Sequence, residues 1–145
     1  MTACTSRCTF AATLVALTCA GCIRTHWDEP RIVAVTPEPD AVEVPVDAVV
    51  EVRFDERIRA STLDAGNFYV WDVDGDVEVP GVRSYEIETR AARFVSDELY
   101  LPGRRYRVVV DDDVRSECCG VRLRNGLIWE FTTAPAAPAT VDPGR

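Results

Sequence analysis

The sequence predicts an all-β protein, an antiparallel β-sandwich of about seven strands. From Pro30 onward, short valine-rich runs in which every second residue is apolar alternate with turn residues about every 8–12 positions. The chain's nine prolines and eight glycines also favour an all-β fold with many turns. A length of 145 residues allows one such domain with an export segment before it.

Three extended segments are predicted in the first half of the domain. Residues 31–36 are apolar and stop at the turn formed by residues 37–40. Residues 49–55 alternate strictly, which is typical of a strand with one buried and one solvated face. The third segment, residues 68–71, ends at the aspartate-rich turn 72–76. The buried face of the second segment would hold Val50, Val52 and Phe54, and its solvated face Glu51, Arg53 and Asp55.

Four more segments follow in the second half. Residues 82–88 and 91–95 would form a hairpin across the turn at 89–90. Residues 105–110 form a further β-rich run. The last strand is predicted at 127–133, where the large side chains on one face are those of Trp129 and Phe131.

Two segments lie outside the predicted strands. Residues 60–65 are the one helical candidate, a single turn that Ser61 could cap. Residues 135–145 carry too few apolar side chains to form a packed element, so we expect a disordered tail there.

The first 21 residues resemble a secretory signal peptide. One positive charge, Arg7, precedes the apolar run 10–17, which is far shorter than the roughly 20 residues that a membrane span needs. The run ends in Ala20-Gly21-Cys22, which resembles a bacterial lipobox, although Cys19 stands where that motif usually has leucine. The resemblance implies cleavage before Cys22 and attachment of a lipid such as palmitate to it.

These residues predict an extracytoplasmic, lipid-anchored protein with four segments. They are a lipoprotein signal peptide (1–21), a lipidated tether (22–29), the folded domain (30–134) and the tail (135–145). The tether can reach at most about 25 Å. Ile23 rather than aspartate after Cys22 favours the outer membrane if the cell has two membranes. Secretion without a lipid and retention in the cytoplasm remain alternatives.

Charge argues against nucleic acid as a partner. The chain has no lysine, and its 16 basic residues, all arginine, face 24 acidic ones. Removal of Arg7 with the signal peptide leaves 15 arginines and a net charge of −9. A surface with such an excess of negative charge repels phosphate backbones.

The domain resembles the bacterial Ig-like domain family named after the SbsA surface-layer protein. The resemblance covers residues 30–134 and rests on five short motifs in the same order. They are Val35-Thr36-Pro37, Val44-Pro45-Val46-Asp47 with 52–56, Ser61-Thr62-Leu63 with 66–68, Leu101-Pro102-Gly103-Arg104-Arg105-Tyr106, and Trp129-Glu130-Phe131-Thr132-Thr133.

The resemblance implies an Ig-like antiparallel β-sandwich without catalytic residues or cofactors, used as a structural, spacer or adhesive module. In the fourth motif, a Pro-Gly turn would bring the Tyr106 hydroxyl back to the backbone, as in a tyrosine corner. The chain departs from the family before the last strand, where it has Ser116-Glu117-Cys118-Cys119-Gly120.

Cys118 and Cys119 form the most unusual pair in the sequence. Signal cleavage removes three of the six cysteines and the lipid occupies Cys22, so only this pair would remain in an oxidising compartment. The pair could form a vicinal disulfide, stay reduced or bond to a partner chain. A metal would need further ligands, and the single histidine, His26, lies in the tether.

A second candidate site is calcium at Asp72, Asp74 and Asp76, because calcium binds clustered carboxylates on loops. The residues do not match a full calcium-binding motif, so a solvated hairpin tip remains the alternative. The folded part also lacks the histidine that a nucleophilic triad requires.

The sequence therefore predicts a non-catalytic, membrane-anchored Ig-like module of the cell envelope with a structural or binding role. Its partners would be the membrane, through the lipid, and an envelope protein or glycan. The alternatives are a loop-mediated ligand-binding or calcium-binding adhesion module, a secreted Ig-like domain without a lipid, and an enzyme.

Overall fold

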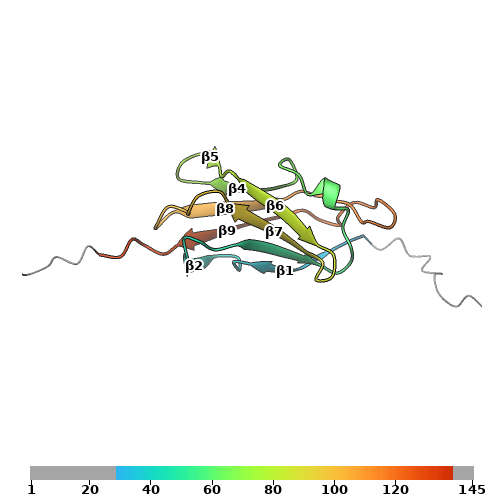
Figure 1. The fold of residues 1–145 in the computed structure, drawn as a ribbon, viewed down its shortest axis with the longest axis horizontal. Helices are drawn as coiled ribbons and strands as arrows, with labels where there is room; N and C mark the ends of the chain where they lie inside the picture. The colour runs from blue at the N-terminus through green and yellow to red at the C-terminus, as the bar shows by residue number, and fades with distance from the viewer. Residues whose placement is uncertain (1–28, 139–145) are drawn as a thin grey trace, which may run out of the picture.

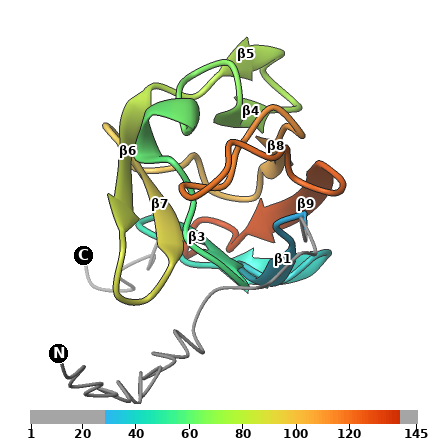
Figure 2. The same ribbon diagram turned by 90° about the vertical axis from the view of Figure 1, so that its right-hand side faces the viewer.

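The computed structural model describes residues 29–138 (Figure 1). The chain forms two packed β-sheets, which Figure 2 shows as two layers. One sheet has four strands in the order β1-β3-β7-β6, and the other has five in the order β2-β9-β8-β4-β5. All pairings are antiparallel except that of β2 with β9. The predicted all-β sandwich is confirmed.

The four-stranded sheet contains β1 (Ile32–Thr36), β3 (Val50–Phe54), β6 (Gly81–Glu86) and β7 (Ala91–Ser96). The five-stranded sheet contains β2 (Ala41–Val44), β4 (Phe68–Asp72), β5 (Val77–Glu78), β8 (Arg105–Val110) and β9 (Leu127–Thr133). All seven predicted strands are present. The described residues form nine strands rather than about seven, because β2 and β5 were not predicted.

The core lies between the two sheets, where alternate side chains of each strand meet. In β3, Val50, Val52 and Phe54 are buried while Glu51 and Arg53 face outward, as the alternation predicts. Trp129 and Phe131 of β9 are buried on the opposite side of the core. The other fully buried side chains include Phe68, Val70, Phe94, Val108 and Val110.

The predicted tyrosine corner is confirmed. The backbone N–H of Leu101 donates a hydrogen bond to the Tyr106 hydroxyl at 2.8 Å. Gly103 has a φ of +64°, which the turn requires and which glycine adopts without steric cost. The Tyr106 ring packs against the rings of Tyr100 and Phe131, with centroid separations of 4.7 Å and 5.6 Å. This corner therefore ties the start of β8 to the core.

The helical candidate is shorter than predicted, and its proposed cap is wrong. The structure has a 3₁₀ turn, η1 (Ala60–Thr62), with Arg59 at the N-cap and no side-chain capping bond. Ser61 lies inside the turn and cannot accept from the N–H groups that follow a cap. The Thr62 hydroxyl instead donates to the Arg59 carbonyl oxygen at 2.7 Å.

The two ends of the described chain leave the sandwich at opposite ends (Figure 1). The Arg124 N–H donates to the Pro30 carbonyl at 3.0 Å, so the chain enters beside the long β8–β9 connection. The Gly103 N–H donates to the Ala134 carbonyl at 2.9 Å, so the chain leaves beside the tyrosine corner. Within residues 29–138, no helix is long and apolar enough to cross a membrane.

Candidate functional site

The Cys118–Cys119 pair lies in the long β8–β9 connection, at the end of the sandwich where the chain enters. Both side chains are exposed, and both are thiols. Their sulfur atoms are 2.9 Å apart, with Cys118 donating to Cys119. The bond to Cys118 raises the pKa of the Cys119 thiol, with smaller contributions from burial and from nearby negative charge. The geometry therefore presents two sulfur atoms side by side to solvent.

The backbone around the two cysteines is held by hydrogen bonds. The Ser116 N–H donates to the Val121 carbonyl at 2.8 Å, and the Val121 N–H donates to the Ser116 hydroxyl at 3.1 Å. The Glu117 N–H donates to the Arg57 carbonyl at 2.9 Å, which fixes the loop to the segment after β3. Gly120 follows the pair with a φ of +69°, which lets the chain turn back.

This arrangement can form a disulfide between neighbours, or bind one soft cation through two sulfur atoms. In the part of the chain that the structure describes, no group of three or more histidine, cysteine, aspartate or glutamate side chains is placed to hold a metal ion. The predicted bond between Cys118 and Cys119 stays a prediction, because the two residues are close but unbonded here.

The second predicted site, the Asp72–Asp76 loop, connects β4 to β5 at the opposite end of the sandwich (Figure 1). Asp72 is buried, and its Oδ1 accepts from the N–H groups of Asp74 and Gly75 at 3.1 Å and 2.8 Å. Its Oδ2 accepts from Arg104 Nη1 at 2.9 Å. Asp72 therefore organises the hairpin between β4 and β5.

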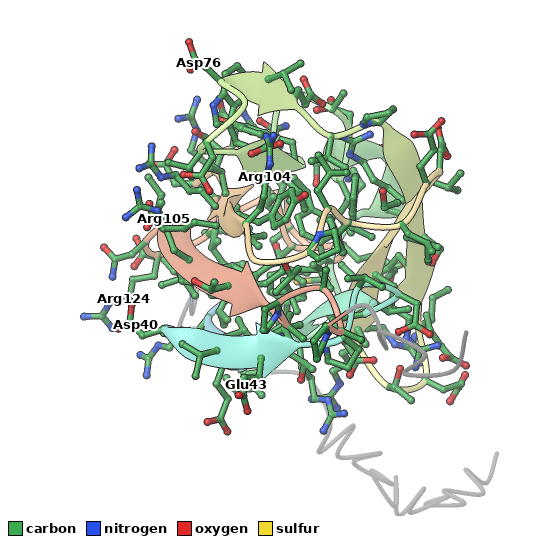
Figure 3. The ribbon with its side chains drawn as sticks, turned by 90° about the vertical axis from the view of Figure 1, so that its left-hand side faces the viewer. Asp40, Glu43, Asp76, Arg104, Arg105 and Arg124 are labelled. Atoms are coloured by element: carbon green, nitrogen blue, oxygen red, sulfur yellow. The ribbon has the colours of Figure 1, made fainter. Side chains whose placement is uncertain are left out.

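The other two aspartates of this loop do not converge with Asp72. Asp74 Oδ2 accepts from the Arg105 N–H at 2.9 Å, and Asp76 projects outward at a φ of +53° (Figure 3). Calcium binding by the three residues stays a prediction. Calorimetric titration of the chain with calcium tests it, and an absence of both heat and a shift in melting temperature would end it.

Two residues that hold this end of the sandwich together, Arg104 and Thr133, were not predicted from the sequence. Arg104 forms an ion pair with the buried Asp72. Thr133, buried at the end of β9, accepts a hydrogen bond from the Arg104 N–H at 3.0 Å and donates one to the Leu101 carbonyl at 2.6 Å. A threonine at an inward position of the last strand was the one available signal for this role.

Three other predictions concern residues outside those described. Cys22, the proposed lipid site, lies there together with the signal peptide and most of the tether. His26 also lies there, as do the last seven residues of the predicted tail.

Residues 27–133 match the family of bacterial Ig-like domains. Among solved structures, the surface-layer protein SbsC (domains 1–6) has a TM-score of 0.54 at 16% identity, covering 78% of this chain and 15% of SbsC. CopC from Methylosinus trichosporium OB3b has a TM-score of 0.57 at 15% identity, covering 76% of this chain and 98% of CopC.

The L,D-transpeptidase LdtMt1, solved in complex with imipenem, has a TM-score of 0.53 at 19% identity. The match covers 74% of this chain and 41% of the transpeptidase. No curated protein sequence matches the chain. At these identities, the likenesses concern the fold, and this chain spans only a small part of SbsC.

Proposed function

The chain belongs to the bacterial Ig-like domain family, and on that premise we propose that it is a non-catalytic module of the cell envelope, anchored to a membrane through a lipid on Cys22. The observation that carries the proposal is the order of its parts. A short apolar run ending in Ala20-Gly21-Cys22 stands directly before an Ig-like domain, with only residues 23–29 between them.

The non-catalytic part of the proposal rests on the composition of the domain. The described residues include no histidine, so neither a Ser-His nor a Cys-His pair can be assembled from them. An Ig-like sandwich also serves many proteins as a scaffold or spacer, and its fold alone supplies no catalytic machinery.

The anchor would set the orientation of the domain. Pro30 lies beside Arg124, at the end that carries the Cys118–Cys119 loop. A lipid on Cys22, joined to Pro30 by the seven residues 23–29, would keep that end within about 25 Å of the membrane. The Asp72–Asp76 loop and the tyrosine corner would then point away from it. Outer-membrane sorting belongs to the same proposal if the cell has two membranes.

Metabolic labelling with palmitate tests the anchor. We expect the wild-type chain to take up label and Cys22→Ala to take up none, because only the residue at the cleavage site is acylated. Cys19→Ala is the matched control, since it changes a cysteine three positions earlier and should keep the label. A wild-type chain that is cleaved but unlabelled would support the secreted alternative and overturn the anchor.

A further inference from the structure

The outward face of the five-stranded sheet carries a row of side chains that the proposed function does not use. Strand register places Glu78 of β5 opposite Trp71 of β4, Trp71 opposite Arg107 of β8, and Arg107 opposite Glu130 of β9. Residues directly opposite in paired strands have their side chains on the same face of the sheet. One aromatic ring therefore stands in a row of charged hydrogen-bonding groups.

The neighbouring row on this face is apolar. Tyr69 of β4 lies opposite Val109 of β8, which lies opposite Ile128 of β9. Tyr69 and Trp71 are both partly exposed, and Ile128 is 64% exposed. Tyr69 and Trp71 are two positions apart on one strand, so their side chains leave the sheet about 7 Å apart.

The two arginines of this face both lie close to Glu130. Arg107 Nη2 lies 2.7 Å from Glu130 Oε1, and Arg105 Nε lies 3.8 Å from Glu130 Oε2. Asp40, just before β2, adds a second carboxylate to the surface that Arg107 and Glu130 line. The face is therefore close to neutral, although the whole chain has a net charge of −8.

A shallow hollow adjoins the row at β9. Its volume is about 490 Å³, and its lining residues are Pro39, Asp40, Arg107, Ile128, Trp129 and Glu130. Arg107 and Glu130 belong to both the hollow and the row, so the two features form one continuous surface. The Trp129 indole N–H donates to the Pro37 carbonyl at 2.9 Å, which ties β9 to the turn before β2.

We propose that this surface binds a neutral glycan chain of the cell envelope. A pyranose ring has an apolar face of C–H groups and an edge of hydroxyls. The apolar face matches an aromatic ring such as that of Trp71. The hydroxyls, which both donate and accept, match a guanidinium and a carboxylate that are already fixed by an ion pair. A hollow beside such a ring has room for one further sugar.

The charge of the surface selects this partner over other polymers. A polyanionic glycan or nucleic acid would meet a molecule of strong net negative charge and a face whose two arginines already lie beside Glu130. Tryptophan, tyrosine and arginine also occur at protein interfaces, so docking of a second copy of this chain is the competing occupant. The inference deepens the proposed envelope function and rests on it.

Isothermal titration of the full chain with two neutral hexasaccharides, chitohexaose and cellohexaose, tests the proposal. A galacturonic acid hexamer serves as the anionic comparison. We expect one of the neutral chains to bind, and Trp71→Ala to weaken that binding by at least about tenfold, because the stacking ring is lost. Arg107→Ala should weaken it by about threefold to tenfold. Arg53→Ala is the matched control, because it removes an ion-paired arginine of similar exposure from the outward face of the other sheet.

Three outcomes would overturn the proposal. They are no heat with either neutral hexasaccharide, binding that Trp71→Ala leaves unchanged, and tighter binding of the anionic hexamer. Sedimentation equilibrium of the same samples tests the competing occupant, and a dimer that Trp71→Ala dissociates would assign the face to a second copy. Palmitate labelling measures the anchor independently, so failure of the glycan proposal leaves the anchor result intact.

Discussion

Tyr100 and Tyr106 are neighbours in the core, yet their hydroxyls differ in hydrogen bonding. The Tyr106 hydroxyl accepts from the Leu101 N–H, whereas the buried Tyr100 hydroxyl has no hydrogen-bond partner among the described residues. A buried hydroxyl without a partner costs free energy, while one that satisfies a backbone N–H stabilises the fold. The two residues therefore make a matched pair for mutation.

Removal of each hydroxyl should have opposite effects on stability. Tyr106→Phe leaves the Leu101 N–H without its acceptor and should lower the free energy of unfolding by about 1–2 kcal/mol. Tyr100→Phe removes an unsatisfied group and should leave that free energy unchanged or raise it by up to about 1 kcal/mol. Urea denaturation measures both. Equal destabilisation by the two variants would contradict this account of the corner.

Burial of Tyr100 also predicts sensitivity to alkali. Burial raises the pKa of the Tyr100 phenol in the folded protein, and the nearby Tyr106 raises it further. The pKa of tyrosine in the unfolded chain is about 10. Because the pKa of Tyr100 is higher in the folded protein, the protonated phenol contributes its full stability to the fold below about pH 10. That contribution is lost as the pH rises further. The chain has no lysine, so no lysine ammonium titrates in this range. The melting temperature should fall above about pH 10, and less steeply in Tyr100→Phe.

The Cys118–Cys119 pair should form a disulfide under oxidising conditions. Oxidised glutathione would accept the two electrons and both protons, joining the two sulfur atoms that now lie 2.9 Å apart. We expect the chain to become two hydrogens lighter by mass spectrometry and its melting temperature to change little, because adjacent cysteines enclose no loop whose entropy could be lost. The double variant with serine at both positions is the control. A disulfide-linked dimer, or two thiols that persist, would contradict the prediction.

At the scale of elements, the clearest predictions came from strict alternation. Residues 50–54 alternate between buried and outward side chains as predicted, since each strand packs one face on the core. Strand β2 was missed because only Val44 of its four residues is buried, and Glu43 has a φ of +57° that interrupts the alternation. Strand β5 was missed because it has only two residues, both exposed. Both strands lie at the edges of the five-stranded sheet. Few of their side chains are buried, so the alternation of apolar and polar residues is weak there.

The pairing of β6 with β7 depends on a glycine that the alternation does not reveal. A Cβ atom at Gly81 would lie 2.6 Å from the Val95 carbonyl oxygen and would also contact the buried Phe94 ring. Gly81→Ala should therefore push the two strands apart and lower the free energy of unfolding by about 1–3 kcal/mol. Gly66→Ala is the control, because a Cβ there has only an ordinary contact, at 3.4 Å. Equal stability of the two variants in urea would contradict the close approach.

At the scale of the whole molecule, more of the fold than of the surface arrangement could be predicted from the sequence. The motif from Leu101 to Tyr106 is local in sequence, so its turn and its hydrogen bond could be predicted together. The ion pair of Asp72 with Arg104 joins residues 32 positions apart and depends on the strand order, which the alternation alone does not determine. The row from Glu78 to Glu130 likewise requires the register of four strands.

The sandwich itself is a scaffold with two unlike ends and two outward faces. The chain enters at the end with the two cysteines and leaves at the end with the tyrosine corner. An anchor on Cys22 would turn the end with the two cysteines toward the membrane. The outward face of the five-stranded sheet would then stay accessible beside the membrane. The account therefore depends on where the mature chain begins and what its first residue carries.

The intact mass of the chain purified from the membrane fraction of the producing cells tests this claim most directly. We predict a chain that begins at Cys22 and is heavier than residues 22–145 by the mass of its attached lipid. A chain that still begins at Met1 and is found soluble in the cytosol would contradict it.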